Sequence, residues 1–363
     1  MPYTGLSDRL IAIHNEIRSI YPKLGRLSVA LYDPVSDTMY TFLNSSDPSP
    51  ALTNYQVPLD EVPSLKELIK TRQTRIIDDM SVMAGSNKKH TQKLLQAGFQ
   101  SSLTIPMYSA EHFQGFLFFN SLDKNFFTQV IRSHLSVYAQ LISAIIEGEM
   151  SRIRTLQGAM KTAREFSRYR DEETGSHLTR MAHYARFIAI ELADHFRFDD
   201  RYIEYVLQFA PLHDIGKIAI PDNILLKKAR LDDQEKVIMR THVEKGVAMI
   251  DTIVRELGLQ GIEHTTMLRN IVAYHHECYD GSGYPNGIAS HYIPVEASIV
   301  TAADVFDALT SSRPYKEAWS FEDAEAYMVE QKGKIFHPLC VEALQRRIAD
   351  MQSIRNRFED EPF

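Results

Sequence analysis

Two kinds of hydrophobic pattern divide the chain. Before about residue 125, short apolar or alternating runs lie at residues 27–33, 38–43, 101–108 and 115–120, with Asp, Asn, Pro and Gly at the joins. Amphipathic stretches of helical period lie between these runs. Short strands that follow one another in this way usually pair antiparallel, so we expect an α+β domain around an antiparallel sheet over residues 1–125.

A longer helical pattern follows. Residues 126–170 contain no proline, and apolar side chains recur at steps of three and four, at Val130, Ile131, Leu135, Tyr138, Ile142, Ile145, Ile146, Met150, Ile153, Leu156, Met160 and Ala163. The spacing predicts one long helix with an apolar seam, assigned to residues 126–164 as a connection between domains. The seam could pack on neighbouring elements, but no partner within the chain is evident. We therefore expect a homodimer through this helix.

The remaining sequence, after Thr174, is a series of helical periods broken by Pro and Gly, with few alternating runs long enough for strands. This pattern predicts an all-α helical bundle over residues 165–363. The expected fold class is therefore multidomain, with an α+β domain, a long connecting helix and an all-α bundle.

Charge, cysteine content and hydropathy exclude several classes of protein. A net charge of -7 and a pI near 6.1 provide no basic field for long nucleic acid. The two cysteines, Cys278 and Cys340, can build neither a disulfide framework nor a cysteine zinc site, which fits a reducing compartment. The first 21 residues lack the pattern of an export signal, and the apolar run at 141–146 is too short for a bilayer span. We expect a cytoplasmic protein without a membrane anchor.

Histidines gather in the second part of the chain, with four before residue 160 and ten after it. Five segments combine them with carboxylates or cations: "EETGSH", "HDIGK", "THVEKG", "HHECYDGSGYP" and "TAADVFDALTSSRPYK". Isolated histidines on apolar faces are usually hydrogen-bonded core residues, and we interpret His183, His195, His264 and His291 in that way.

The spacing within these segments indicates metal ligands. Glu173 and His177 are four residues apart and would share one helical face, although a carboxylate at a helix start also stabilises the helix dipole. A carboxylate can bridge two ions while its neighbour binds one, so His213 and Asp214 suggest a bridged centre. The pair His275 and His276, after an apolar run, also needs more partners than a core usually provides. Imidazole and carboxylate without thiolate favour iron or manganese.

Residues 165–350 resemble the HD-GYP domain, a subgroup of the HD phosphohydrolases that hydrolyse cyclic di-GMP. The resemblance rests on five motifs in the family's order, "ETGSH", "HDIGKIAIPDNILLK", "THVEKG", "HHECYDGSGYPNGI" and "ADVFDALTSSRPYK". It implies a bridging role for Asp214 and a third-metal ligand at Glu173. The metal ligands that it implies are Glu173, His177, His213, Asp214, His242, His275, His276 and Asp304, for two or three divalent ions, iron or else manganese.

Residues 20–122 more loosely resemble a GAF domain, through "YQVPLDEVPSLKELIKTRQTRIIDD" and "GFQSSLTIPMYSAEHFQGFLFFN". Such domains sense small ligands or dimerise. The resemblance implies a sensory or dimerisation domain at 1–125, with an unknown small ligand, that regulates the HD-GYP domain at 165–363.

Further residues are expected to act in catalysis or to bind the substrate. Asp214 and Lys217 are expected to act in catalysis, with the Lys217 ammonium near the phosphate or the leaving oxygen. Arg313 and Lys316 would form a cationic lip for the phosphate. Lys217 could instead be a solvated side chain, and Arg313 and Lys316 ordinary surface charge. Tyr284 and Asp307 complete the expected set of substrate-binding residues, which is Lys217, Tyr284, Asp307, Arg313 and Lys316.

Three functions remain open. The first is a metal-dependent phosphodiesterase that cleaves cyclic di-GMP to pGpG and, with a third ion, on to GMP. The second is a sensor or adaptor with negligible turnover that acts through protein contacts. The third keeps the chemistry but acts on another cyclic dinucleotide or on a nucleotide monoester.

Overall fold

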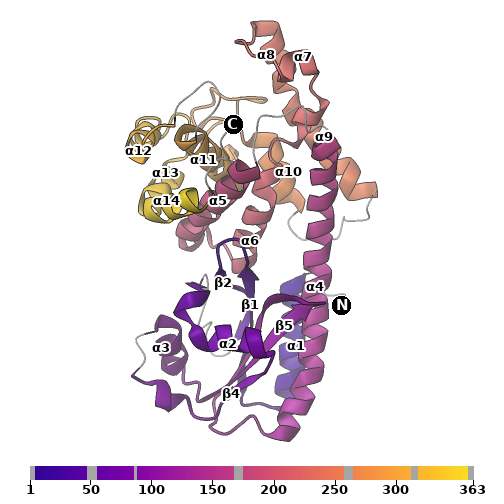
Figure 1. Ribbon diagram of the computed structural model, residues 1–363, viewed down its shortest axis with the longest axis vertical. Coiled ribbons are helices and arrows are strands. Elements are labelled where there is room, and N and C mark those ends of the chain that lie inside the picture. The colour runs from indigo at the N-terminus through magenta and orange to yellow at the C-terminus, as the bar shows by residue number, and fades with distance from the viewer. Residues whose placement is uncertain are drawn as a thin grey trace. The chain divides into compact units, whose positions relative to one another are not determined.

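The computed structural model describes residues 5–46, 55–85, 88–166, 175–256, 265–311 and 318–358. The chain divides into two compact units, Met1–Met150 with Asp199–Arg201, and Ser151–Phe198 with Tyr202–Phe363. Each unit has its own architecture (Figure 1).

The first unit is built around a six-stranded sheet with the order β3-β2-β1-β6-β5-β4, in which all neighbours are antiparallel. The expected α+β domain is confirmed, and the four expected strands are β1, β2, β5 and β6. The short strands β3 and β4 extend the two edges. The strands are β1 (Leu24–Asp33), β2 (Thr38–Ser46), β3 (Gln56–Pro58), β4 (Arg75–Ile77), β5 (Ser101–Ser109) and β6 (His112–Ser121).

Strand β1 shows how the sheet separates its two faces. Leu27, Val29 and Leu31 alternate with Arg26, Ser28 and Ala30, and five of these six side chains are less than 5 % exposed. Both faces are thus covered, which requires helices on each side. The helices of this unit are α1 (Leu6–Ile20), α2 (Pro63–Thr71), α3 (Lys89–Gln96) and the first part of α4 (Gln129–Phe166), with 3-10 turns at η1 (Leu59–Glu61) and η2 (Met80–Met83).

The long helix is confirmed as α4, and its apolar seam is already covered. Leu135, Ile142, Ile146, Ile153 and Leu156 are each at most 3 % exposed within the single chain. The expectation that the seam has no partner in its own chain is therefore wrong. Among the side chains of α4 whose burial is described, the exposed large apolar ones lie on another face, at Val130, Val137 and Leu141.

Within the described residues of the second unit, the regular secondary structure is helical, apart from one isolated bridge between Lys332 and Phe336. The expected all-α bundle is confirmed. Its helices are α5 (Gly175–Phe196), α6 (Asp200–Phe209), η3 (Ala210–Leu212), η4 (Ile215–Ala219), α7 (Asp222–Leu225), α8 (Asp233–Arg240), α9 (His242–Glu256), α10 (Thr265–Tyr274), η5 (Ser290–Tyr292), α11 (Val295–Thr310), α12 (Phe321–Glu330), α13 (Pro338–Arg346) and α14 (Ile348–Arg357).

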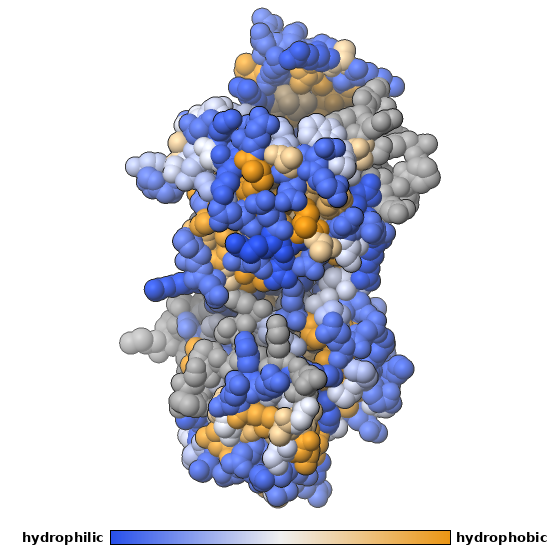
Figure 2. Space-filling model, turned by 90° about the vertical axis from the view of Figure 1, so that its left-hand side faces the viewer, coloured by the Kyte–Doolittle hydropathy of each residue, from blue (hydrophilic) through white to orange (hydrophobic). Residues whose placement is uncertain are grey.

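One face of the molecule carries mainly hydrophilic side chains, and its apolar side chains form separate groups (Figure 2). Within the described residues, no helix has both the length and the apolar character needed to cross a bilayer.

Candidate metal centre

The second unit brings the expected ligands together from segments far apart in sequence. His177 lies on α5, and His213 and Asp214 occupy the junction between η3 and η4. His242 begins α9, while His275 and His276 directly follow α10. Asp304 lies on the buried helix α11, which contacts α5 and α10. The core of the helical bundle thus fixes where each ligand lies.

Asp214 is the point at which these segments meet. Its Oδ1 lies 3.1 Å from His242 Nε2 and 3.4 Å from His275 Nε2. Its Oδ2 lies 3.2 Å from His213 Nε2 and 2.7 Å from Lys217 Nζ. The two carboxylate oxygens therefore face two different sets of nitrogen atoms, which is the arrangement that a bridging carboxylate requires.

Backbone carbonyls fix the tautomer of three imidazoles. His213 Nδ1 donates to Ala210 O at 2.9 Å, His242 Nδ1 to Met239 O at 2.7 Å, and His275 Nδ1 to Ile271 O at 3.1 Å. A carbonyl oxygen can only accept, so Nδ1 carries the proton in each ring. In the neutral ring Nε2 then presents its lone pair to Asp214, as a metal ligand does.

This arrangement is unfavourable without a cation between the rings and the carboxylate. Asp214 Oδ1, His242 Nε2 and His275 Nε2 are buried and have no hydrogen-bond partner among the described residues. Acceptors that face each other across 3.1 to 3.4 Å repel one another. Two ligand atoms on one ion, each bound at about 2.0–2.2 Å, lie at about this separation. The residues present therefore fit a divalent metal.

A central cluster of four residues offers ligand atoms that all lie within 4.8 Å of one another: Asp214, His242, His275 and His276. Burial lowers the pKa of His275 and holds that of His276 well below its usual value, so both rings are neutral and ready to ligate. Burial alone would raise the pKa of Asp214, but Lys217 and His213 offset it and keep that pKa well below the usual range.

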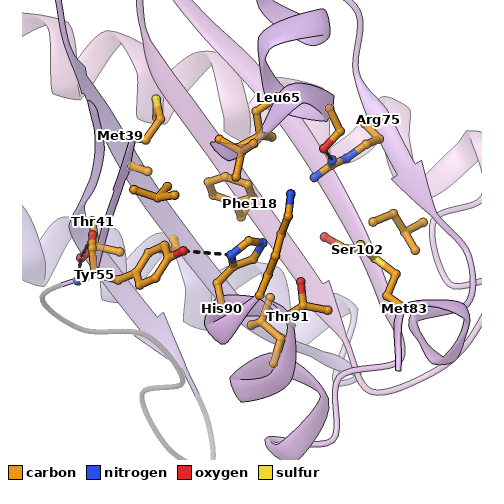
Figure 3. A pocket seen from close by; sticks show the side chains of 18 of the residues that line it. Met39, Thr41, Tyr55, Leu65, Arg75, Met83, His90, Thr91, Ser102 and Phe118 are labelled. Atoms are coloured by element: carbon orange, nitrogen blue, oxygen red, sulfur yellow. Dashed lines mark hydrogen bonds between the residues drawn. The ribbon is translucent and has the colours of Figure 1, made fainter. Parts of the chain in front are cut away.

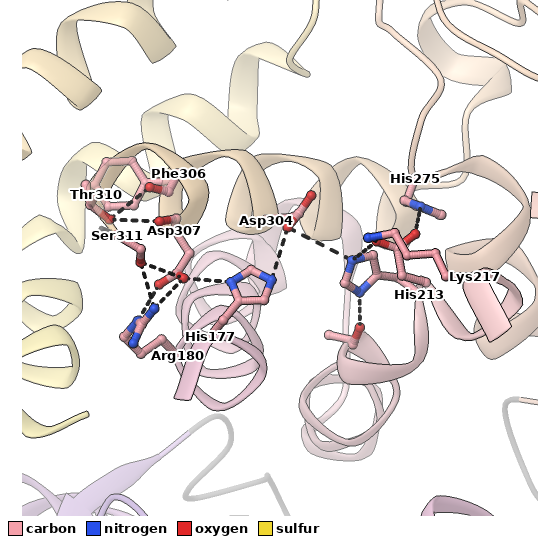
Figure 4. Close-up of polar contacts among 12 residues, drawn as sticks. His177, Arg180, His213, Lys217, His275, Asp304, Phe306, Asp307, Thr310 and Ser311 are labelled. Carbon is pink, nitrogen blue, oxygen red and sulfur yellow. Dashed lines mark hydrogen bonds and ion pairs between the residues drawn. The ribbon is translucent and has the colours of Figure 1, made fainter. Parts of the chain in front are cut away.

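A second group of ligands lies on the other side of Asp214. Asp304 Oδ1 is 3.5 Å from His177 Nε2 and 4.0 Å from His213 Nε2 (Figure 4). His213 thus stands between Asp214 and Asp304. Seven of the eight expected ligands, all except Glu173, lie in these two groups.

Asp307 does not have the expected role in substrate binding. It is fully buried, accepts a hydrogen bond from His177 Nδ1 at 2.7 Å, and receives two more from Arg180 at 2.7 and 2.8 Å (Figure 4). His177 and Arg180 lower the pKa of Asp307 against the opposing effect of its burial. The carboxylate therefore stays ionised and positions the His177 ring, one residue removed from the centre.

The glycines of this region allow close contact between η4 and α9. A Cβ at Gly216 would lie 1.8 Å from His242 O and 2.5 Å from Gly246 N. No side chain fits there, so glycine brings Asp214 within reach of His242. This confirms the expected close approach at Gly216.

Tyr284 lies at the edge of the central cluster. Its ring stacks on His276 with centroids 4.6 Å apart, and the guanidinium carbon of Arg240 is 4.7 Å from the ring centroid. Burial raises the pKa of Tyr284, so its hydroxyl stays protonated and can donate to a substrate oxygen. Glu277 holds the loop that follows Tyr284 by accepting from Asn286 N and Ile288 N.

Three residues near the centre were not predicted from the sequence, and three predicted residues lie outside the part of the chain that the structure describes. Sequence reasoning did not single out Arg180, Arg240 or Glu277, because a lone charged residue carries no spacing signal. Of these, Glu277 stands directly after His276, which is the one signal that could have identified it. Glu173, Arg313 and Lys316 lie outside the described residues.

Comparison with known proteins identifies the class. The HD domain model matches residues 172–338, so this part of the chain is similar to HD domains. A cyclic di-GMP phosphodiesterase response regulator, RpfG, from Xanthomonas campestris pv. campestris (strain 8004) is 40 % identical over 224 residues, which are 62 % of this chain and 55 % of that protein. A 3'3'-cGAMP-specific phosphodiesterase 2 from Vibrio cholerae is 30 % identical over 311 residues, 84 % of this chain and 52 % of that protein.

The chain thus spans about half the length of these relatives. Among solved structures, a GAF domain/HD domain protein from Geobacter sulfurreducens is 17 % identical with a TM-score of 0.32, covering 40 % of this chain and 95 % of that one.

The close contact at Gly216 gives a first prediction. Gly216→Ala should push η4 away from α9 and separate Asp214 from His242, with a loss of about 1–3 kcal/mol in the free energy of unfolding and most of the bound metal. Gly148→Ala is the control, since nothing lies within 4 Å of its added Cβ on α4. Denaturation and metal analysis test both variants. Full metal content in Gly216→Ala would contradict the role given to this contact.

The position of Asp307 gives a second prediction. Asp307→Asn should weaken metal binding by about 10–100-fold, because the His177 ring loses its charged acceptor. Metal content is measured after dialysis against graded metal concentrations. Asp251→Asn, which removes an exposed ion pair with Arg269, should bind metal as the wild type does. Asp307→Asn with unchanged affinity would show that Asp307 is not a positioning residue.

Proposed function

We propose that the protein is a metal-dependent phosphodiesterase that cleaves cyclic di-GMP to pGpG. The single observation that carries this proposal is the Asp214 carboxylate, whose two oxygens face separate sets of nitrogen atoms in the region that the HD domain model matches. The relatives named above as cyclic di-GMP or 3'3'-cGAMP phosphodiesterases support a cyclic dinucleotide as the substrate class.

Two divalent ions are proposed, and Glu173 would supply a ligand for a third. When bound, such ions supply Lewis-acid stabilisation of the phosphoryl charge and lower the pKa of water. Imidazole and carboxylate donors favour iron, with manganese as the alternative. The cysteines Cys278 and Cys340 are free and take no part in the central cluster.

The cations and the phenol around the cluster provide the substrate contacts in this proposal. Lys217 Nζ, held at Asp214 Oδ2, lies where it can neutralise a phosphate oxygen or protonate the leaving oxygen. Tyr284 can donate its hydroxyl proton to the substrate, and Arg240 beside it adds a charge for the second phosphate. Arg313 and Lys316 are proposed to complete this cationic edge.

Regulation by the N-terminal unit is part of the proposal. Helix α4 runs unbroken from Gln129 to Phe166 through the boundary of the two units, and the next described helix, α5, carries His177 two residues after its start. A change in α4 could therefore reach the metal centre through the start of α5. We place the protein in the cytoplasm, where both cysteines would remain reduced.

Turnover tests the catalytic proposal. Protein purified without oxygen and loaded with iron or manganese should convert cyclic di-GMP to pGpG, followed by chromatography, and Asp214→Asn should lower kcat by about 10³-fold or more. Loss of only the step from pGpG to GMP in Glu173→Ala would support a third ion. In the same assay Arg240→Gln should raise KM about tenfold without lowering kcat.

The alternative is a sensor or adaptor that binds cyclic di-GMP or metal and acts through protein contacts. Metal-loaded protein that binds cyclic di-GMP but releases no product would favour it and contradict the enzyme. Faster turnover of 3'3'-cGAMP than of cyclic di-GMP would instead keep the chemistry and change the substrate.

We further propose a homodimer through α4, by a different face from the buried seam. Val130, Val137 and Leu141 are 64, 66 and 48 % exposed and are spaced by seven and four residues, as in a helix pair. Light scattering should give twice the chain mass of 41.6 kDa, and Val137→Glu should give the single mass. Val329→Glu, on α12, is the control for an exposed valine elsewhere. A wild-type monomer would contradict this interface.

A further inference from the structure

The N-terminal unit contains a cavity against one face of its sheet. It lies between the face that carries Ser28, Ser102 and Phe118 and the segments that carry Leu65 on α2 and His90 on α3 (Figure 3). The space open to the centres of water-sized spheres is about 110 Å³. An apolar cavity of about 150 Å³ binds benzene, so this one, which is smaller and partly open to solvent, suits a short branched chain or a single ring that projects from it.

The charges around the cavity have one sign. Arg26, Arg75 and Lys88 are among its lining residues, and none of the described residues that line it is Asp or Glu. The whole chain has more acidic than basic residues, 47 against 40, so this lining does not reflect the average composition. Burial lowers the pKa of Arg26 to about 10 against the opposing charge of Asp200, and burial also lowers the pKa of Arg75. Two guanidiniums are thus desolvated beside an apolar space, where an anion would compensate them.

The hydrogen bonds of these arginines go to neutral groups. Arg26 donates to Asn44 Oδ1 at 3.1 Å and to Asn120 Oδ1 at 2.8 Å. Arg75 donates through Nη1 to Ser64 Oγ at 2.8 Å and through Nη2 to Thr104 Oγ1 at 3.3 Å. These contacts fix the two guanidiniums in position but supply no negative charge. The charge of Asp200 acts on Arg26, whereas burial is the cause of the lowered pKa of Arg75.

Two polar atoms in the lining lack a partner. Arg75 Nε and Ser28 Oγ are buried and have no hydrogen-bond partner among the described residues, and Ser28 is 0 % exposed. A buried donor that makes no hydrogen bond lowers the stability by about 1–3 kcal/mol, so native structures rarely contain one without a functional reason. Both atoms can donate, which calls for a ligand rich in acceptor atoms.

His90 supports the same ligand chemistry. Its Nδ1 is 2.9 Å from the Tyr55 hydroxyl (Figure 3). Burial and the charges of Lys88 and Arg75 lower the pKa of His90 to about 4, so the ring is neutral at physiological pH. An anion beside Arg75 would reverse part of this effect and raise that pKa.

We propose that this cavity is a binding site for a small organic anion. Its carboxylate or phosphate lies on Arg75 and Ser28, and its apolar part packs on Leu65 and Phe118. The proposal is independent of cyclic dinucleotide hydrolysis, because none of these residues belongs to the helical unit.

Calorimetry on the full chain tests the site with two matched pairs of probes, benzoate with benzamide and isobutyrate with isobutyramide. Each pair keeps its shape and differs in charge. At least one anion should bind ten times more tightly than its amide, and Arg75→Gln should weaken that binding at least tenfold. Arg72→Gln removes an exposed arginine that pairs with Glu111 and should bind as the wild type does. A titration with phenyl phosphate in place of benzoate shows whether the site binds a phosphate or a carboxylate more tightly.

Ser28→Ala keeps the test decisive if Arg75→Gln fails to fold. It removes a buried hydroxyl that has no partner, so the ligand-free chain should be as stable as the wild type or more so, while binding of the anion weakens several-fold. Equal binding of anion and amide, absence of binding by both anions, or full binding by Ser28→Ala and Arg75→Gln would overturn the proposal.

Discussion

The structure of the helical unit depends on one buried carboxylate, that of Asp214. An ionised carboxylate inside a protein is unfavourable unless charges and hydrogen-bond donors compensate it. Here one ammonium, that of Lys217, compensates the charge, while the Nε2 lone pairs of His213, His242 and His275 face the same two oxygens and call for a cation between rings and carboxylate. These groups come from the junction of η3 and η4, from α9 and from the end of α10. The helical bundle must hold all of these elements in place for the charge to be tolerated, and a metal ion satisfies the same oxygens more completely than the lysine does.

Two further constraints aim the ligands at this carboxylate. Carbonyls at the ends of the preceding helical turns hold the Nδ1 protons of His213, His242 and His275, so each ring turns the same atom inward. The Asp307 carboxylate accepts the Nδ1 proton of His177 in the same way, and Arg180 holds Asp307 in place with a hydrogen bond of its own. Glycine at 216 then sets the separation between η4 and α9. Ligand identity, ring orientation and backbone spacing are thus three separate requirements that the fold meets together.

Much of this site could be predicted from the sequence, and the reason is local. The adjacent polar pairs His213 with Asp214 and His275 with His276 lie inside apolar runs. Burying such a pair without partners costs too much free energy for a core, so the pairs indicate ligands even when the fold is unknown. The strands of the N-terminal sheet were predictable for a similar reason, since alternation and turn residues are local signals. The edge strands β3 and β4, three residues each, are too short to carry such a signal.

The errors arose where the role of a residue is set by its tertiary neighbours. Asp307 lies three residues after Asp304 on α11, and spacing alone allows both to face the site. Only the packing of α5 on α11 places His177 and Arg180 against Asp307 and removes it from the substrate. The seam of α4 was misjudged in the same way, because periodicity reveals an apolar face but not the element that covers it.

The central claim is that Asp214 bridges two ions, and anomalous diffraction tests it most directly. Crystals of protein purified without oxygen, measured at the iron and manganese absorption edges, should give two peaks about 3.5–4 Å apart, one on each side of the Asp214 carboxylate. A single peak held only by the central cluster, or metal bound without contact to Asp214, would contradict the account.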